Sequence, residues 1–213
     1  MQTIDVFGHT IVKTSCGDKS LYATKTVVSN LESLIKLANQ KAMLSKRTVP
    51  SIVGNIETTD QIFQHKLNPL NIKFLAPLNK WISDQLLCCA KHFVDYPVAD
   101  VSNIYSWANI MFSGSQVKVH SHKYTVSQRN PDCVAIFYVK AFADSANLTF
   151  VDPDHGDQKS GLLDDYAAEH KHQICAVDGD MIVHSPALPH GVSVHTHDTP
   201  RICLVVDAKF VAL

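Results

Sequence analysis

The chain has 213 residues, of which 46% are hydrophobic and 18% are charged, and its formal net charge is −1. This composition is typical of a globular protein and excludes a chain that stays disordered for lack of hydrophobic residues. The balanced charge provides no basic surface for nonspecific binding to nucleic acid. The length suits one domain with its own core, and we expect residues 1–213 to form a single domain.

Short stretches of alternating polar and apolar residues open the chain. Such alternation places apolar side chains on one face of a strand. A helix is expected to follow from Leu31 to about Leu44, where apolar residues recur at helical spacing, and the Ser29-Asn30 pair would cap its start. The strands expected before this helix are Thr3–Val6, Thr10–Lys13 and Leu21–Thr26.

A second helical region is expected between about Asn71 and Val94, after a loop over residues 50–60. Leu78, Ile82 and Leu86 recur there at helical spacing, and Pro77 breaks or begins the longer helix. We interpret the apolar stripes of both helices as packing faces rather than binding sites. Residues 1–99 are therefore expected to supply N-terminal strands and supporting helices.

From about residue 100 the pattern changes to many short strands with no helices between them. Several are separated by turn sequences rich in Gly, Pro, Asn and Asp. This pattern predicts a chain that is mainly β with α, in which residues 100–213 form a jelly roll, or double-stranded β-helix, braced by the N-terminal helices. The expected strands are Ile104–Met111, Gln116–Tyr124, Cys133–Ala141, Leu148–Val151, Ile174–Val177, Met181–His184, Val192–Val194 and Ile202–Val206.

The six cysteines form no CxxC pair and no disulfide framework. Most lie in apolar surroundings, which is typical of buried free thiols in a reducing compartment. The N-terminus lacks the charged and apolar regions of a signal peptide. No apolar stretch approaches the roughly 20 residues needed to cross a bilayer. We therefore expect a cytoplasmic protein.

The segment His120-Ser121-His122 is the most informative feature of the sequence. Residues i and i+2 of a strand share a face, so these two imidazoles can bind one ion. Lys118 and Tyr124 would share that face, while Val117 and Val119 would point the other way. A face this polar suits a site at the mouth of a barrel. Two further His-x-His pairs lie in polar or turn-rich segments and are interpreted as exposed: His170 with His172, and His195 with His197.

Pro189-His190-Gly191 supplies the candidate for a third ligand from a distant strand. Three protein ligands on one face of an octahedron leave positions open for oxygen and a chelating cosubstrate, as in non-haem Fe(II) oxygenases. The planar fork of Arg201 would hold the far carboxylate of that cosubstrate. The segments Val192–Val194 and Arg201–Val205 are interpreted as a hairpin. Arg201 shares the face of His190 if the connection has six residues and lies on the opposite face if it has five.

At these residues the chain resembles the 2-oxoglutarate/Fe(II)-dependent oxygenases, in particular a prolyl-hydroxylase-like group common in bacterial and phage genomes. The resemblance covers about residues 104–206, roughly half of the chain. Each motif is short, and their order along the chain is the specific feature. The matching stretches are Trp107–Met111, Gly114, His120–His122, Ile136–Val139, Leu148–Pro153, Asp178–Val183, Ser185-Pro186, His190–Val192 and Arg201-Ile202.

The resemblance implies a dioxygenase that hydroxylates its substrate and converts 2-oxoglutarate and oxygen to succinate and CO2. It implies Fe(II) as cofactor, bound by the catalytic triad His120, His122 and His190, and 2-oxoglutarate as cosubstrate. The cosubstrate-binding residues would be Arg201 at the far carboxylate, Tyr138 through its hydroxyl, and Asn109. The substrate, a small molecule or a peptide, and the oligomeric state are not identified by these motifs.

The wider superfamily mostly has His-x-Asp or His-x-Glu where this chain has His120-Ser121-His122, so a carboxylate such as Asp132 stays an alternative third ligand. Three histidines also bind iron in some cupin dioxygenases. These enzymes bind their substrate directly to iron without 2-oxoglutarate, and Arg201 would then have no special role. A second alternative is a non-catalytic jelly-roll binding module, in which the histidines are structural or hold zinc.

Overall fold

The structure of this protein is a computed structural model. It is mainly β, with two α-helices in the described part of the chain, α1 (Lys25–Leu44) and α2 (Ala76–Cys89). This confirms the sequence-based prediction of a β-rich chain with helices in its first half. The described residues are 1–44, 51–60, 68–122, 130–155 and 161–213.

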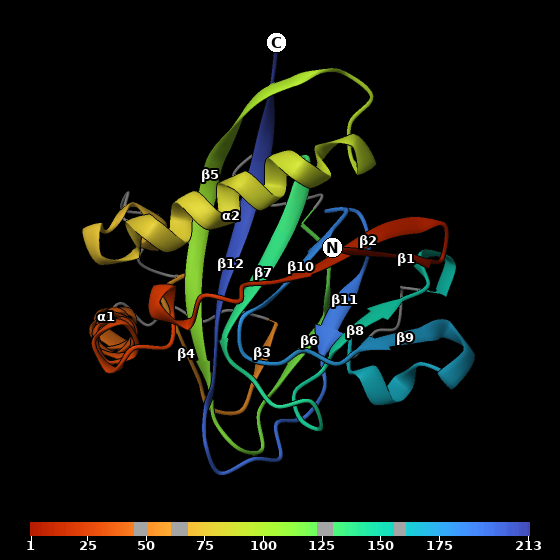
Figure 1. Ribbon diagram of the computed structural model, residues 1–213. Helices are drawn as coiled ribbons and strands as arrows, with labels where there is room; N and C mark the ends of the chain where they lie inside the picture. The colour runs from red at the N-terminus through yellow and green to blue at the C-terminus, as the bar shows by residue number, and fades with distance from the viewer. Residues whose placement is uncertain (45–50, 61–67, 123–129, 156–160) are drawn as a thin grey trace.

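The strands form two antiparallel sheets, which Figure 1 shows facing each other. The larger sheet has seven strands in the order β1 (Gln2–Val6), β2 (His9–Ser15), β10 (Asp180–His184), β7 (Cys133–Lys140), β12 (Arg201–Ala212), β5 (Val98–Met111) and β4 (Ile56–Thr58). The smaller sheet has five strands in the order β3 (Ile52–Val53), β6 (Gln116–His120), β11 (His190–Val192), β8 (Leu148–Val151) and β9 (Lys171–Ile174).

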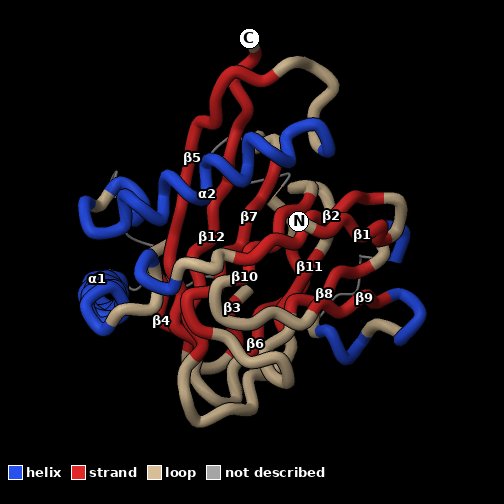
Figure 2. The backbone as a smooth tube through the Cα atoms, in the orientation of Figure 1, coloured by secondary structure: helices blue, strands red, loops and turns tan. Residues whose placement is uncertain are grey.

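The two α-helices lie outside the sheets, and Figure 2 shows α2 crossing one face of the seven-stranded sheet. The buried side chains of α2 recur every three or four residues, so they form one apolar stripe. Pro77 stands in the first turn of α2, where its missing N–H costs nothing. Short 3-10 turns cover Lys19–Leu21, Pro69–Asn71, Lys73–Leu75, Ala90–His92, Pro153–His155, Leu163–Asp165 and Ala168–His170.

The seven-stranded sheet has an apolar core on each face. On its outer face, Ile202, Leu204 and Val206 of β12 belong to the cluster that includes the buried stripe of α2. On its inner face, Cys203 and Val205 belong to a second cluster, which also contains residues of the five-stranded sheet. Successive residues of a strand point to opposite faces, so one strand contributes to both cores. The space between the sheets holds the polar residues described below.

Several predicted boundaries were wrong. The strand expected at Leu21–Thr26 is a 3-10 turn followed by the start of α1 at Lys25. The hydroxyl of Thr24 accepts a hydrogen bond from the N–H of Val27 at 3.2 Å, so Thr24 satisfies a free donor of the first turn in place of the Ser29-Asn30 pair. The strand expected at Ile174–Val177 ends at Ile174 and begins earlier, at Lys171.

Other segments differ in extent. The loop expected over residues 50–60 contains β3 and β4, which pair with the ends of β6 and β5. Residue 50 lies outside the described residues. The strand expected at Gln116–Tyr124 ends at His120, and the last two residues of that prediction, 123 and 124, also lie outside the described part of the chain. The second helical region contains the 3-10 turn Lys73–Leu75 before α2 begins at Ala76 and the 3-10 turn Ala90–His92 after α2 ends.

Candidate metal centre

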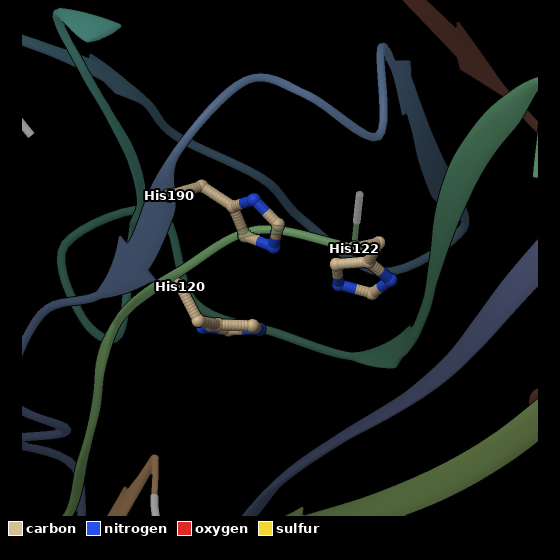
Figure 3. A group of neighbouring side chains, drawn as sticks. All are labelled: His120, His122 and His190. Atoms are coloured by element: carbon tan, nitrogen blue, oxygen red, sulfur yellow. The ribbon is translucent and has the colours of Figure 1, made fainter. Parts of the chain in front are cut away.

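Three histidines from two neighbouring strands converge in the space between the sheets. His120 ends β6, His190 begins β11, and the two are directly paired across these strands. His122 follows β6 by two residues. Figure 3 shows the three rings around a shared space. One nitrogen of each ring lies within 4.8 Å of the others, which makes the group a candidate metal site.

The separation of the rings fits a shared ion. The ring centroids of His120 and His190 are 4.6 Å apart, those of His122 and His190 are 5.2 Å apart, and those of His120 and His122 are 5.4 Å apart. Imidazoles that bind one ion through nitrogens about 2.1 Å from it have centroids roughly 4.5–5.2 Å apart. Two of the three separations fall in this range, and that of His120 and His122 exceeds its upper end by 0.2 Å, so the three rings are spaced nearly as ligands of one ion are.

Each of the three rings has its Nδ1 atom committed to an acceptor. His120 Nδ1 lies 2.8 Å from the carbonyl oxygen of Lys118, and His190 Nδ1 lies 3.1 Å from that of Leu188. His122 Nδ1 lies 2.6 Å from Oδ1 of Asp207. A carbonyl or carboxylate oxygen can only accept, so Nδ1 carries the proton in each ring. The lone pair of each neutral ring is then on Nε2, the atom left for an ion.

Burial keeps the imidazoles of His120 and His190 neutral. Removal from water lowers the pKa of His120 to about 4, and the neighbouring His122 adds to this shift. Burial also lowers the pKa of His190, with further contributions from His184 and His120. Because a metal binds the unprotonated ring, these shifts favour metal binding at neutral pH.

A glycine allows β6 and β11 to approach closely enough for this arrangement. The pairing of these strands contains a β-bulge between the His190–His120 and Val192–Val117 pairs. A Cβ atom on Gly191 would lie 2.8 Å from the carbonyl oxygen of Val117, so a larger residue would push the strands apart. The bulge also changes which side chains of β6 point to the same face of the sheet. Val117 packs in the core between the sheets, contrary to its predicted orientation away from His120.

A fourth buried histidine, His184 at the end of β10, lies beside the triad and was not predicted as a site residue. Its ring centroid is 4.5 Å from that of His190. Its Nδ1 donates to the carbonyl oxygen of Ser185 at 2.9 Å, whereas Nε2 is buried without a hydrogen-bond partner among the described residues. Burial lowers the pKa of His184 to about 3, and His122 adds to the shift. Its neutral ring presents a free lone pair inside the protein.

Arg201 is buried at the start of β12. Within the described residues no carboxylate lies within ion-pair distance of its guanidinium, and its Nε has no hydrogen-bond partner. Its Nη1 lies 3.6 Å from Sγ of Cys203, a weak acceptor. A buried cation without an anion is costly, so the chemistry of this group calls for an anionic partner. The carboxylate of 2-oxoglutarate fits that requirement.

Tyr138 and Asn109 lie near Arg201 on neighbouring strands. The guanidinium carbon of Arg201 stands 4.7 Å from the centre of the Tyr138 ring, and the buried Tyr138 hydroxyl has no hydrogen-bond partner in the described structure. Burial raises the pKa of Tyr138 to about 12, so its hydroxyl stays a donor. Asn109 is paired with Cys203 across β5 and β12, and Nδ2 of Asn109 lies 4.0 Å from Sγ of Cys203. Arg201 and Tyr138 thus provide unused donors side by side.

The hairpin predicted between Val192–Val194 and Arg201–Val205 was wrong. β11 pairs with β6 and β8 in the five-stranded sheet, whereas β12 pairs with β5 and β7 in the seven-stranded sheet. The connection between them therefore crosses from one sheet to the other. His190 and Arg201 come from opposite sheets, and neither predicted loop length describes their relation.

His195 and Asp132 were also misjudged. His195, predicted to be exposed, is fully buried, and its two ring nitrogens bond to Oγ of Ser145 at 2.8 Å and to the carbonyl oxygen of Thr199 at 2.9 Å. It thereby holds the connection between the sheets in place. Asp132, the alternative carboxylate ligand, instead accepts a hydrogen bond from the N–H of Phe210 at 2.8 Å. Asp132 directly precedes β7 and bonds to the end of β12, and it is not part of the histidine group.

A second group of metal-binding residue types, Asp152, His155 and His170, lies nearer the surface. Nδ1 of His155 and Nδ1 of His170 lie 3.2 Å and 3.7 Å from Oδ2 of Asp152, so the three side chains satisfy one another. The two rings are stacked with centroids 3.6 Å apart. This is closer than the roughly 4.5–5.2 Å expected for two rings on one ion. We therefore interpret the group as a carboxylate that pairs with two stacked imidazoles and not as a second metal site.

The fold is similar to that of several solved structures, although neither a protein-family model nor a curated protein matches the sequence. A prolyl-4-hydroxylase from Pseudomonas putida is 14% identical, with a TM-score of 0.55 over 96% of this chain and 94% of that chain. HygX from Streptomyces hygroscopicus, solved with nickel and 2-oxoglutarate bound, is 12% identical, with a TM-score of 0.56 over 93% of this chain and 82% of that chain.

A third similar structure is SnoK, a non-heme alpha-ketoglutarate-dependent carbocyclase from nogalamycin biosynthesis. It is 14% identical, with a TM-score of 0.58 over 93% of this chain and 78% of that chain. At these identities the comparison shows that the chain shares the fold of these oxygenases. Among the helices of the described residues, none combines the length and hydropathy of a membrane span.

Proposed function

We propose that this protein is an Fe(II)- and 2-oxoglutarate-dependent oxygenase, that is, a dioxygenase that hydroxylates its substrate and releases succinate and CO2. Residues 1–213 form one domain in this proposal, with a double-stranded β-helix core over residues 100–213. The observation that carries the proposal is the combination of three converging imidazoles with a buried arginine that has no acidic partner among the described residues. One similar structure, HygX, contains nickel and 2-oxoglutarate.

The three histidines bind the iron in this proposal. Their Nδ1 protons are held by acceptors of the protein, so each ring is fixed in the tautomer that directs a lone pair at the ion. Ligands fixed in this way lose little conformational entropy when the ion binds. The iron, when bound, supplies the oxidising chemistry that side chains cannot perform.

Arg201 and Tyr138 bind the far carboxylate of 2-oxoglutarate. The free Nε–H of Arg201 and the Tyr138 hydroxyl are donors that match two carboxylate oxygens. Asn109 adds an amide on the same face of the large sheet, where it contacts the cosubstrate or the substrate. The apolar core around these groups excludes water, which strengthens the ionic bond and orients the cosubstrate toward the histidines.

The substrate is an unidentified small molecule or peptide. All six cysteines are unpaired, and four of them are buried. Free thiols are typical of reducing compartments, which supports a cytoplasmic location in this proposal.

An anaerobic titration tests the proposal. Addition of 2-oxoglutarate to the ferrous protein should produce a weak visible charge-transfer band, and the Arg201→Ala variant should lack it at the same concentration. Lys80→Ala, which removes an exposed side chain remote from the site, is the control and should keep the band. Turnover of 2-oxoglutarate to succinate, measured with a metabolite library, would then identify the substrate. A wild-type protein that binds no stoichiometric iron would overturn the proposal.

The second candidate function is a three-histidine dioxygenase that does not use 2-oxoglutarate. The all-histidine triad favours it, because three neutral ligands are the arrangement of some cupin dioxygenases. In that case iron binds, but 2-oxoglutarate produces no charge-transfer band and Arg201→Ala leaves substrate turnover unchanged. The guanidinium of Arg201, which has no acidic partner among the described residues, is the reason to prefer the first candidate.

A further inference from the structure

We propose that Asp207 is a positioning residue of the metal centre. Acting through His122, Asp207 supplies the negative charge that a carboxylate ligand supplies in a site of two histidines and one carboxylate. Sequence reasoning did not identify this residue. The inference rests on the metal site of the proposed function and is independent of 2-oxoglutarate. It accounts for how an all-histidine triad can hold a divalent ion inside a protein.

Asp207 is a buried carboxylate in the middle of the large sheet. It lies on β12, paired with Tyr105 of β5 on one side and Val134 of β7 on the other, and it is 1% exposed. Its Oδ1 accepts a hydrogen bond from Nδ1 of His122 at 2.6 Å. A carboxylate removed from water costs several kcal/mol unless a positive charge compensates for it.

The compensating charge does not come from a basic side chain. In the described part of the chain, no lysine or arginine lies within ion-pair distance of Asp207, and its one such partner is His122. On the far side of the His122 ring lie the nitrogens of His120 and His190, all three donor atoms being within 4.8 Å. A divalent ion bound between these nitrogens would compensate the negative charge of Asp207 from the other side of the His122 ring.

His122 differs from the other two ligands in this respect. His120 and His190 direct Nδ1 at neutral backbone carbonyls, whereas His122 directs it at a carboxylate. A hydrogen bond to an ionised acceptor is stronger and makes the ring a better donor to a metal. The site therefore has one ligand that is electronically distinct, as a site with one carboxylate ligand does.

Two further contacts hold the His122 ring in the orientation in which its Nδ1 faces Asp207. The ring stacks on Trp107 of β5, with centroids 5.7 Å apart and planes inclined by 20°. The backbone N–H of His122 donates to the carbonyl oxygen of Pro186 at 2.9 Å. Trp107 and Asp207 stand on adjacent strands of the large sheet, so this sheet orients a ligand that follows a strand of the small one.

Asp207→Asn tests the inference, since asparagine keeps the shape of the side chain and one acceptor oxygen but removes the charge. The matched control is Asp180→Asn, which alters a second buried carboxylate, paired with Lys13 at 2.9 Å in the same sheet. Anaerobic titration with Co(II), followed by visible absorption, reports affinity and ligand field without turnover. We expect Asp207→Asn to weaken Co(II) binding about 10–100-fold and Asp180→Asn to leave it unchanged.

Thermal unfolding separates positioning from a structural role. Without metal, Asp207→Asn should be at least as stable as the wild type, because a buried charge has been removed. With saturating Co(II), the gain in melting temperature should be larger for the wild type than for the variant. A merely structural Asp207 would instead lower stability equally with and without metal, and that result would overturn the inference.

A double-mutant cycle with His122→Ala provides the second arm. Since Asp207 acts through His122, Asp207→Asn should cause no further loss of Co(II) affinity in the His122→Ala background. If Asp207→Asn does not fold, Asp207→Glu, which keeps the charge, should fold and retain more of the affinity than Asp207→Ser. Equal Co(II) affinity of the wild type and Asp207→Asn would overturn this inference alone. A wild type that binds neither Co(II) nor Fe(II) would overturn the proposed function as well.

Discussion

The two faces of the seven-stranded sheet differ in their buried charge, although the same strands form both faces and each face has an apolar core. On β12, the outward residues Ile202, Leu204 and Val206 pack into the apolar core under α2. The inward positions include Arg201 and Asp207, which are buried as well. The outer face thus contributes hydrophobic burial, and the inner face combines burial with charge.

The inner face is costly for the folded protein. Nε of Arg201, the hydroxyl of Tyr138 and Nε2 of His184 are buried without hydrogen-bond partners in the described structure. Each such group costs about 1–3 kcal/mol relative to a satisfied one. The apolar outer face offsets this cost. The outward residues of β12 thus contribute to stability, and the charged residues of the site stand at alternate, inward positions of the same strand.

The largest expected effect is the loss of a ligand on the inner side. We expect His190→Ala to weaken Fe(II) or Co(II) binding by more than about 100-fold, because structural sites gain roughly 3–4 kcal/mol per ligand. His172→Ala, which removes a partly exposed histidine of β9, is the control and should bind as the wild type does. Metal titration monitored by visible absorption measures both. Retention of stoichiometric iron in the His190→Ala variant would contradict the assignment.

A change on the outer face should affect stability and not the site. Leu204 is fully buried, and we expect Leu204→Ala to lower the free energy of unfolding by about 2–5 kcal/mol. The folded fraction should bind Co(II) with wild-type affinity. Urea denaturation and metal titration of the same preparation test both statements. A weakened metal site in the folded Leu204→Ala variant would show that the two faces are coupled.

Acid should destabilise the metal-free protein through the inner face. The folded-state pKa of His184 is about 3 and that of His120 about 4, both below the value of about 6.5 in an unfolded chain. Between these values the unfolded chain binds protons that the folded protein does not. The free energy of unfolding should therefore be constant above about pH 6.5 and fall below it, by up to about 1.4 kcal/mol per pH unit for each such histidine.

Urea denaturation of the metal-free protein from pH 8 to pH 5 measures this slope. His184→Gln removes one of the titrating groups and should reduce the slope, whereas Leu204→Ala should lower the whole curve without changing its shape. A profile that is flat from pH 8 to pH 5 would rule out neutral buried histidines in the folded state.

The smallest effect is expected from Tyr138→Phe. This change deletes a hydroxyl that has no hydrogen-bond partner among the residues that the structure describes, so the metal-free protein should keep its stability within about 1 kcal/mol or become more stable. The same change should weaken the binding of 2-oxoglutarate to the ferrous protein. Denaturation and the charge-transfer titration test these opposite effects. A large loss of stability would indicate that the Tyr138 hydroxyl has a structural partner.

Part of this architecture was predictable from the sequence. The alternating pattern of the second half identified most strands, and the strand predicted at Leu148–Val151 has those bounds in the structure. The His120-Ser121-His122 spacing identified two of the converging rings. These features are local, since residue spacing along one strand decides which side chains share a face.

The remaining features depend on long-range pairing. The connection from His190 to Arg201 reads as a hairpin in sequence, but it crosses between sheets, and buried His195 fixes it through Ser145, which is far away in the chain. Asp207 could have been noticed as a single acid in the apolar run Val205-Val206-Asp207-Ala208. Its role could not be assigned, because His122 lies 85 positions away along the chain.

The central position of β12 has a mechanical consequence. Arg201 and Asp207 are six residues apart on this strand, a span of about 20 Å that covalent geometry and pairing to β5 and β7 hold constant. The anchors on the large sheet therefore behave as a rigid frame. The strands of the five-stranded sheet are shorter than β12, and its β3 and β11 have two and three residues.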